Sequence, residues 1–289
     1  EEPITWSKKP ITLDSSSQSF YKPVRKSAAA TVGDSIYIFG GENPEIGRLS
    51  NAFYKLNIKT FVIKILNSTA TPLARKNHSL NAIDSNRLVL FGGRRLINGD
   101  DEFATVQEMC DTQDFAIYNI EDNTWVSYTD STNFPYRRSL HSTAFSNGKL
   151  YIYGGKLKSA SSTISQIHDD KDIHVYDAQQ DSWQKFLAPS NNAAPPTLLP
   201  LPTNWIATTG RNPGRRKCAA MCLMHNRIAI LGGSEKENWN FETESYPWEL
   251  LKLLTPENRI WEHIRIKDFP RMDCIAVVRE YDIETKGLF

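Results

Sequence analysis

The chain has 289 residues, of which 40% are hydrophobic and 23% are charged, and its formal net charge at pH 7 is +1. This composition is typical of a globular protein with an extensive core, and the small net charge excludes a general electrostatic preference for nucleic acid or anionic membranes. No run of about 18 apolar residues occurs and Glu1-Glu2-Pro3 does not begin a signal peptide, so we expect no membrane insertion.

Residues 1–24 precede the first regular unit of the sequence. Trp6 lies between β-type segments, Ile4-Thr5 before it and Ile11-Thr12 after it, like the outermost strand of a sheet whose earlier strands are absent. From Arg25 onward a longer pattern begins and recurs. The recurring units are residues 25–70, 75–130, 137–187 and 215–266.

The third unit, residues 137–187, shows the pattern most clearly. Its first two strands are joined by Asn147-Gly148, and both residue types tolerate the positive φ of a tight hairpin turn. A second hairpin is expected across the turn from Asp177 to Asp181, which gives four short antiparallel strands. Such a small sheet cannot bury both faces alone, so we expect copies of it on either side.

The same features recur in all four units. Each apolar second strand ends at a glycine doublet, and a tyrosine or leucine is followed seven positions later by tryptophan or phenylalanine. The doublets are Gly40-Gly41, Gly92-Gly93, Gly154-Gly155 and Gly232-Gly233, and the spaced pairs are Tyr54/Phe61, Tyr118/Trp125, Tyr176/Trp183 and Leu254/Trp261. The continuous apolar runs before the doublets indicate strands that are buried on both faces.

A hydrophobic strand that ends in Gly-Gly, followed by a tyrosine and a tryptophan at this spacing, resembles the kelch repeat of β-propellers. The resemblance extends in full repeats from Arg25 to about Trp261. It implies an all-β fold, a β-propeller with four complete four-stranded blades. We also expect Trp125, Trp183 and Trp261 at corresponding positions between blades.

Both ends of the chain contain fragments of a further repeat. Arg271 to Val278 resembles a first strand, and residues 287–289 fall where a second strand would begin. If residues 1–24 and 271–289 share one blade, the propeller has five blades, and a longer protein would allow six or more. We interpret residues 1–289 as one propeller domain that is a segment of a larger chain or complex.

Long insertions in the repeats are expected on a single face. A four-stranded meander places its two short hairpin turns at one end, and its central loop and the interblade connection at the other. The long segments at this second end are 94–112, 156–172, 234–246 and the Pro-rich interblade insertion 188–214. Because loops beyond about 12 to 15 residues in a compact domain are usually either functional or disordered, this long-loop face is the candidate binding surface. The alternative is that the insertions accumulated by drift at tolerant sites.

Arginine opens each repeat, and we expect these arginines around the channel mouth on the long-loop face. Guanidinium groups bind carboxylates in a bidentate manner, and the resemblance implies binding of an acidic partner segment at such a mouth. The predicted partner-binding residues are Arg25, Arg75, Arg138, Arg215 and Arg271, flanked by Trp205 and Trp239. The alternative is that the arginines bond neighbouring backbone or loop acids such as Asp169 and Asp170.

Motifs for catalysis are absent from the sequence, which lacks HExxH, Gly-x-Ser-x-Gly and a phosphate-binding glycine loop. The third positions after the arginines are Ala28, His78, His141, Cys218 and Cys274. Equivalent positions around a channel lie too far apart to converge on a metal, so a structural role is favoured. We predict a protein-interaction scaffold that is not an enzyme and has no cofactor. The alternatives are a metal-dependent oxidase or lyase and a passive structural domain of a larger enzyme.

Cysteine usage favours a cytoplasmic location. The four cysteines lack the spacing of a metal site or a disulfide framework, which suggests a reducing compartment. Secretion is the less favoured alternative. It is suggested by Asn67-Ser68-Thr69 and Asn77-His78-Ser79, which match glycosylation acceptors.

Overall fold

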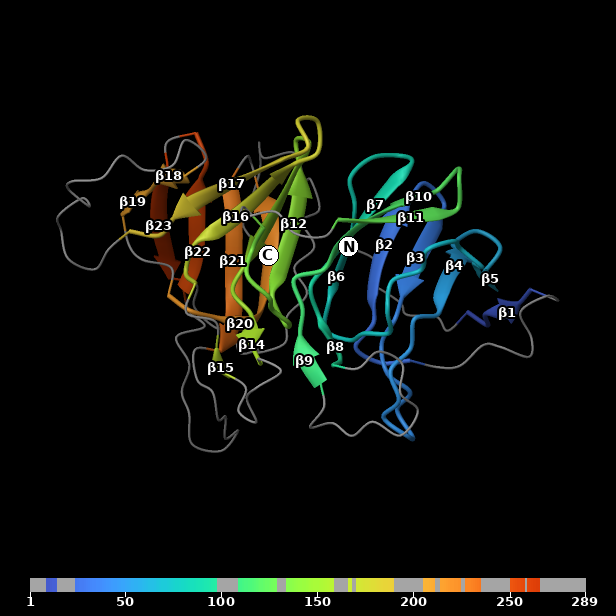
Figure 1. Ribbon diagram of the computed structural model, residues 1–289. Helices are drawn as coiled ribbons and strands as arrows, with labels where there is room; N and C mark the ends of the chain where they lie inside the picture. The colour runs from blue at the N-terminus through green and yellow to red at the C-terminus, as the bar shows by residue number, and fades with distance from the viewer. Residues whose placement is uncertain are drawn as a thin grey trace, which may run out of the picture.

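A computed structural model describes most of the chain. The described residues are 9–14, 24–97, 109–128, 134–158, 166–167, 170–189, 205–210, 214–224, 227–234, 250–257 and 259–265. All regular elements within them are β-strands, which form four antiparallel blades that stand side by side in chain order (Figure 1). This arrangement confirms the predicted all-β propeller fold.

Each blade is a four-stranded meander. Blade 1 contains β2 (Ala28–Val32), β3 (Ser35–Phe39), β4 (Phe53–Asn57) and β5 (Val62–Ile65). Blade 2 contains β6 (Ser79–Ala82), β7 (Arg87–Phe91), β10 (Phe115–Asn119) and β11 (Thr124–Tyr128). Blade 3 contains β12 (Ser142–Ser146), β13 (Lys149–Tyr153), β16 (Ile173–Asp177) and β17 (Ser182–Leu187). Blade 4 contains β20 (Lys217–Met224), β21 (Arg227–Ser234), β22 (Leu250–Thr255) and β23 (Ile260–Arg265).

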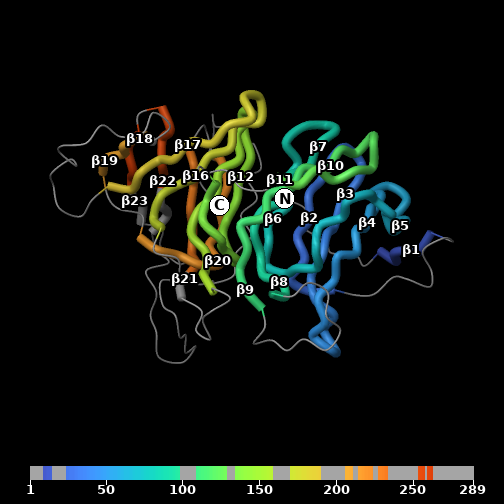
Figure 2. The backbone as a smooth tube through the Cα atoms, in the orientation of Figure 1, coloured from blue at the N-terminus to red at the C-terminus, as the bar shows by residue number. Residues whose placement is uncertain are grey.

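The first strand of each blade is the innermost one. Strand β2 packs against β6, β6 against β12, and β12 against β20, as the backbone trace shows (Figure 2). The turn of the first hairpin in blade 3 is as predicted, since Asn147 and Gly148 have φ values of 50° and 73°. The glycine doublets allow neighbouring blades to approach closely. A Cβ atom on Gly92 would lie 2.7 Å from the carbonyl oxygen of Arg138 in the next blade.

The hydrophobic core of the described residues lies between blades, because adjacent sheets pack face to face. One cluster joins blades 1 and 2, a second joins blades 2 and 3, and a third joins blades 3 and 4. Trp125, Trp183 and Trp261 occupy corresponding positions in these clusters and are 1%, 8% and 3% exposed. Their predicted position between blades is confirmed.

The spaced pair of blade 1 differs from the prediction. Leu56 lies opposite Ile63 across β4 and β5, in the register that joins tyrosine and tryptophan in blades 2 and 3. Phe61 has a φ of 55° and lies in the turn before β5. The residues with positive φ in the corresponding turns are Asn123, Asp181 and Arg259. The pairing of Tyr54 with Phe61 was therefore wrong by two residues.

Three short strands extend the blades at their outer edges, each in parallel orientation. Strand β1 (Thr12–Leu13) pairs with β5, β18 (Trp205–Ala207) with β17, and β19 (Thr209–Gly210) with β23. Residues 12–13 thus belong to blade 1, which corrects their assignment to a separate terminal blade. Residues 205–210 of the Pro-rich insertion pack back on the propeller and connect the outer edges of blades 3 and 4. The further blade expected from residues 271–289 lies outside the described residues and stays a prediction.

The described residues include no helix that is long and apolar enough to cross a membrane. Cys110, Cys218 and Cys222 are free thiols, whereas Cys274 lies outside the described residues. The cytoplasmic location remains a prediction.

Candidate functional site

The long-loop face carries a second layer of short hairpins beyond the blades. Strands β8 (Arg94–Leu96) and β9 (Met109–Asp111) form one hairpin, and β14 (Lys156–Leu157) and β15 (Gln166–Ile167) form another (Figure 1). A small apolar cluster anchors the first hairpin and consists of Leu49, Ala74, Leu96 and Met109. Asp111 joins the two hairpins, because its N–H donates to the carbonyl of Lys158 at 2.9 Å and its Oδ2 accepts the Lys158 N–H at 2.6 Å.

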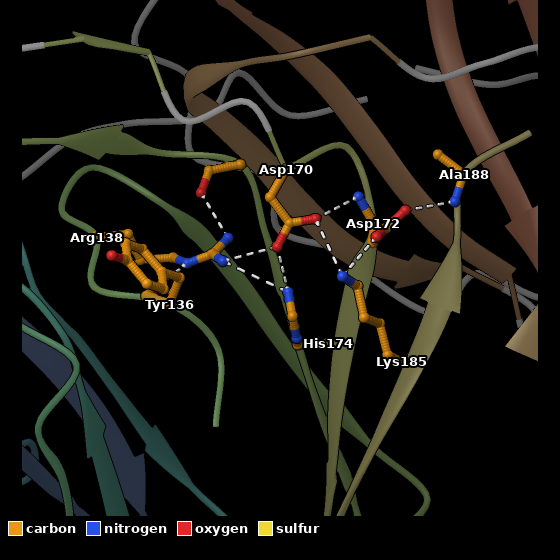
Figure 3. Close-up of polar contacts among 8 residues, drawn as sticks. Tyr136, Arg138, Asp170, Asp172, His174, Lys185 and Ala188 are labelled. Carbon is orange, nitrogen blue, oxygen red and sulfur yellow. Dashed lines mark hydrogen bonds and ion pairs between the residues drawn. The ribbon is translucent and has the colours of Figure 1, made fainter. Parts of the chain in front are cut away.

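Arg138 is buried beneath this face and is 0% exposed. Its Nε donates to the carbonyl of Tyr136 at 3.0 Å and its Nη1 to the carbonyl of Gly154 at 3.0 Å. Its Nη2 donates to Oδ2 of Asp170 at 3.0 Å (Figure 3). The guanidinium therefore connects the interblade segment, the glycine doublet and the following loop of blade 3.

Arg75 makes the same three contacts in blade 2. It donates to the carbonyls of Leu73 and Gly92 at 3.0 and 3.1 Å and to Oδ2 of Asp114 at 2.8 Å, and it is 1% exposed. The counterpart in blade 4 is Arg216, whose Nη1 donates to the carbonyl of Gly232 at 2.7 Å. The alternative role considered for these arginines, bonding to backbone and loop acids, is thus observed for Arg75 and Arg138.

Each inner strand has a residue with left-handed backbone near its start, two residues before the strand in blades 1 to 3 and at its second residue in blade 4. These residues are Lys26, Asn77, Leu140 and Cys218, with φ values of 59°, 56°, 55° and 55°. These residues are joined from blade to blade by backbone hydrogen bonds. The N–H of Asn77 donates to the carbonyl of Lys26 at 3.0 Å, that of Leu140 to Asn77 at 3.0 Å, and that of Cys218 to Leu140 at 2.9 Å. When the blades are aligned on these residues, Arg25 corresponds to Lys76, and the equivalent of Arg138 is Arg216 and not Arg215.

The same alignment corrects the predicted ring of histidine and cysteine positions. The equivalent residues are Ser27, His78, His141 and Ala219, so Ala28 and Cys218 were each displaced by one residue. His78 packs edge-on against Phe39 of blade 1, with ring centroids 5.5 Å apart, and His141 packs against Phe91 at 5.2 Å. Within the described part of the chain, no three or more histidine, cysteine or acidic residues gather closely enough to hold a metal ion.

The buried histidines should make the protein less stable in mild acid. Burial, together with the charge of Arg75, lowers the pKa of His78 from 6.5 to about 3, and burial lowers the pKa of His141 well below its ordinary value. The unfolded chain therefore binds more protons than the folded chain between about pH 6.5 and 3. As the pH is lowered through this range, the free energy of unfolding should decrease by about 1.4 kcal/mol per pH unit for each histidine.

Urea denaturation at about pH 7.5 and pH 5 measures this dependence. Full stability is expected above pH 6.5, the ordinary pKa of histidine. Glu42 does not contribute in this interval, because its pKa falls from 4.5 to about 2 and its contribution is lost only below pH 4.5. The double variant His78→Asn and His141→Asn should retain a smaller dependence, from His174, whose pKa burial also lowers. Equal stability of the native protein at both pH values would contradict this account.

Asp170 is the centre of a buried polar network in blade 3 (Figure 3). Its carboxylate also accepts a very short hydrogen bond from Nε2 of His174, and Lys185 lies between it and Asp172, with Nζ 2.8 Å from Asp172 Oδ2. Burial alone would raise the pKa of Asp170, but the bond from His174 and the charges of Arg138 and Lys185 hold it well below its usual range. The network is internally satisfied and fixes the loop that precedes β16.

A second carboxylate, Glu42, follows the glycine doublet of blade 1 and is 2% exposed. Its Oε1 accepts from Nε of Arg25 at 2.9 Å and from Nζ of Lys26 at 2.5 Å, and its Oε2 accepts from Nζ of Lys76. Burial would raise the pKa of Glu42, but hydrogen bonds from Lys26 and Lys76 lower it to about 2. We call these four residues the Glu42 cluster.

The predicted partner-binding residues fall into three groups. Arg75 and Arg138 are buried and paired within their blades, whereas Arg25 and Arg215 are exposed. Trp205 begins β18, but its side chain, like Arg271 and Trp239, lies outside the described residues. The Glu42 cluster was not predicted, although an acidic residue directly after a glycine doublet, in the same repeat as Arg25-Lys26, was a visible signal.

The four stacked blades, with glycine doublets packed against the next blade, define a kelch-repeat β-propeller. A family model described as the KLHDC2/KLHL20/DRC7 Kelch-repeats domain matches residues 5–198. The chain belongs to this family.

Several curated proteins are similar to the chain. It is 24% identical over 259 residues to N-(sulfonatooxy)prop-2-enimidothioate sulfolyase of Thlaspi arvense, which covers 80% of this chain and 65% of the relative. It is 25% identical over 225 residues to Tip elongation aberrant protein 3 of Schizosaccharomyces pombe, and the match covers 74% of this chain and 19% of the relative. It is 24% identical over 208 residues to human Kelch domain-containing protein 3, and the match covers 72% of this chain and 47% of the relative. The chain thus spans less than two thirds of the length of each of these relatives.

Proposed function

We propose that the chain is a protein-interaction module that binds an acidic segment of a partner protein through its long-loop face. The supporting observation is how charge is exposed there. The carboxylates of Glu42 and Asp111 are 2% and 0% exposed and are bound by cations of the same face, whereas Arg25 and Lys26 remain 56% and 44% exposed. Arg25 and Lys26 bind Glu42 but remain accessible to solvent, so carboxylates of a partner can also bind them.

The buried arginines take a different part in this proposal. Arg75 and Arg138 hold the loops of the face in place from beneath, and the exposed residues Arg25 and Arg215 contact the partner. Arg271, Trp205 and Trp239 remain in the proposed surface on the evidence of the sequence. Membership of the Kelch-repeats family supports an interaction role, and we place the protein in the cytoplasm as a scaffold within a larger chain or complex.

Charge reversal at the two exposed arginines tests the proposal. The double variant Arg25→Glu and Arg215→Glu should capture at least ten-fold less of the partner proteins that the native chain retains from a cell extract, as quantified by mass spectrometry. A matched control with the same charge change on the opposite face is Lys59→Glu with Arg227→Glu, since these residues are 72% and 42% exposed there. Undiminished capture by the first variant, or equal losses in both variants, would refute the proposed surface.

An enzymatic function is the second candidate. It is favoured by the sulfolyase of Thlaspi arvense, which matches 80% of this chain. A propeller lyase or oxidase of the metal-dependent type would carry tightly bound metal at a stoichiometric ratio, which elemental analysis of the purified protein would reveal. A passive structural domain of a larger enzyme would show neither metal nor partner capture.

A further inference from the structure

The Glu42 cluster contains more positive charge than its single carboxylate neutralises. Arg25, Lys26 and Lys76 each donate to Glu42, so three cations surround one anion and two positive charges are left over. Lys76 is 11% exposed, and the excess therefore reaches solvent through Arg25 and Lys26. A surface of this kind attracts an anion with two negative charges more strongly than one with a single charge.

The remaining donors of the cluster are available to such an anion. Only Nε of Arg25 bonds to Glu42, and Nη1 and Nη2 have no acceptor among the described residues. Nζ of Lys26 donates to Glu42 at 2.5 Å and has no second acceptor there either. A planar pair of guanidinium nitrogens beside an ammonium group can bind two or three oxygen atoms of one tetrahedral anion.

The backbone holds these donors in place before any anion arrives. Arg25 and Glu42 form a two-way backbone pair, in which the Arg25 N–H donates to Glu42 at 3.0 Å and the Glu42 N–H donates to Arg25 at 2.9 Å. Lys26 is fixed by its left-handed backbone and by the N–H of Asn77, which donates to its carbonyl. A site whose side chains are already held loses less conformational entropy on binding.

Other charged clusters in the described structure carry a smaller excess of positive charge. Arg75 and Arg95 share Asp114, which leaves one positive charge unmatched. Arg94 directs both Nε and Nη2 to Asp111, at 2.8 and 3.0 Å, in a closed bidentate pair. On the opposite face, charges pair one to one, as in Lys59 with Asp34 and Arg227 with Glu262. The Glu42 cluster therefore differs from these clusters by two unmatched positive charges together with donors that have no acceptor.

We propose that the Glu42 cluster is a binding site for a phosphoryl group, carried by a phosphorylated serine or threonine of the partner protein. A phosphate monoester has a charge of about −1.5 to −2 at pH 7 and three acceptor oxygens, which matches the excess charge and the free donors, whereas a carboxylate offers one charge and two oxygens. This inference rests on the proposed function and names the group recognised there. Phosphorylation of the partner would then regulate docking.

Three end-blocked tripeptides provide the test by isothermal titration calorimetry at fixed ionic strength: Gly-phosphoserine-Gly, Gly-Glu-Gly and Gly-Ser-Gly. The phosphorylated peptide should bind at least ten-fold more tightly than the glutamate peptide, and the serine peptide should not bind detectably. Arg25→Met and Lys26→Met should each weaken binding of the phosphorylated peptide at least ten-fold. Arg227→Met is the matched control and should leave it unchanged, and thermal melting of each variant verifies the fold.

The possible outcomes separate this inference from the proposed function. Equal binding of the glutamate and phosphoserine peptides would overturn the phosphoryl site and leave an acidic-segment site intact. Binding of the phosphorylated peptide that survives both substitutions would place the site elsewhere and overturn the assignment. Absence of binding by all three peptides would also overturn it, and the partner-capture experiment would then judge the proposed function alone. If inorganic phosphate binds as tightly as the phosphorylated peptide and does not reduce partner capture, the site binds a free anion and the assignment to a partner is wrong.

Discussion

Replacing Arg138 with alanine should lower the free energy of unfolding by about 3 to 5 kcal/mol, because removing one member of a buried ion pair leaves the other charge uncompensated. The guanidinium is 0% exposed and donates to two carbonyls and to Asp170. The remaining contacts of Asp170 with His174 and Lys185 should keep the loss near the lower end of this range. Urea denaturation at neutral pH measures it.

The neighbouring arginine provides the control. Arg137 is partly exposed, and its guanidinium lies 5.6 Å from the ring centroid of Tyr136. Arg137→Ala should change the free energy of unfolding by no more than about 0.5 kcal/mol. Arg138→Lys should recover little, because a single ammonium cannot reach the three acceptors that the planar fork joins. Equal stability of Arg138→Ala and Arg137→Ala would show that the buried guanidinium contributes nothing to the fold.

The burial of Arg138 limits how partner binding can be tested. A charge reversal at Arg138 would place a carboxylate beside Asp170 in a buried network and would unfold the blade, so a loss of binding would carry no information about recognition. Arg25 and Arg215 are better positions for a charge reversal because their side chains are exposed, and Glu42 keeps its contacts with Lys26 and Lys76 when Arg25 is changed.

The repeat and its fold could be predicted because their signals are carried by residue types. Gly92 must be glycine, since its φ is positive and a Cβ would lie 2.7 Å from a carbonyl oxygen of the next blade. The tryptophans fill the space between two sheets, which demands a large side chain. Such requirements act on single positions, and they are therefore visible in one sequence.

The register inside the repeat was less visible. The left-handed residues at the starts of the inner strands are a lysine, an asparagine, a leucine and a cysteine, so no residue type marks the position. Counting from an arginine failed in blade 4, where the first of the two adjacent residues Arg215-Arg216 was used. It also failed in blade 1, where Val24 occupies the position of the buried arginine. In blade 1 the aromatic pair Tyr54 and Phe61 also matched the spacing by coincidence, while the true pair is aliphatic.

The site could be predicted only at the level of the face. Topology alone places loops and interblade segments together, so the surface rich in cations was expected there. Whether a particular arginine points to solvent depends on carboxylates far away in sequence, such as Asp114 for Arg75 and Asp170 for Arg138. Those contacts are made by the fold, and local sequence around the arginines does not contain them.

The second large effect is expected at the interface of blades 2 and 3. Trp183 is 8% exposed, and its ring centroid lies 5.3 Å from that of Phe115, 5.5 Å from Phe134 and 5.2 Å from Tyr176. Trp183→Ala removes the indole from among these rings and leaves a cavity, so the free energy of unfolding should fall by about 3 to 5 kcal/mol.

Substitutions at two other positions determine whether this loss comes from the interblade core. Trp125→Ala should cost as much as Trp183→Ala, because Trp125 occupies the same position between blades 1 and 2 and is 1% exposed. Val126→Ala, next to it on the same outer strand but 52% exposed, should change stability by no more than about 0.5 kcal/mol. Chemical denaturation of the three variants compares them directly. A Trp183→Ala variant as stable as Val126→Ala would mean that the tryptophans do not hold adjacent blades together, and the register that places them between sheets would be wrong.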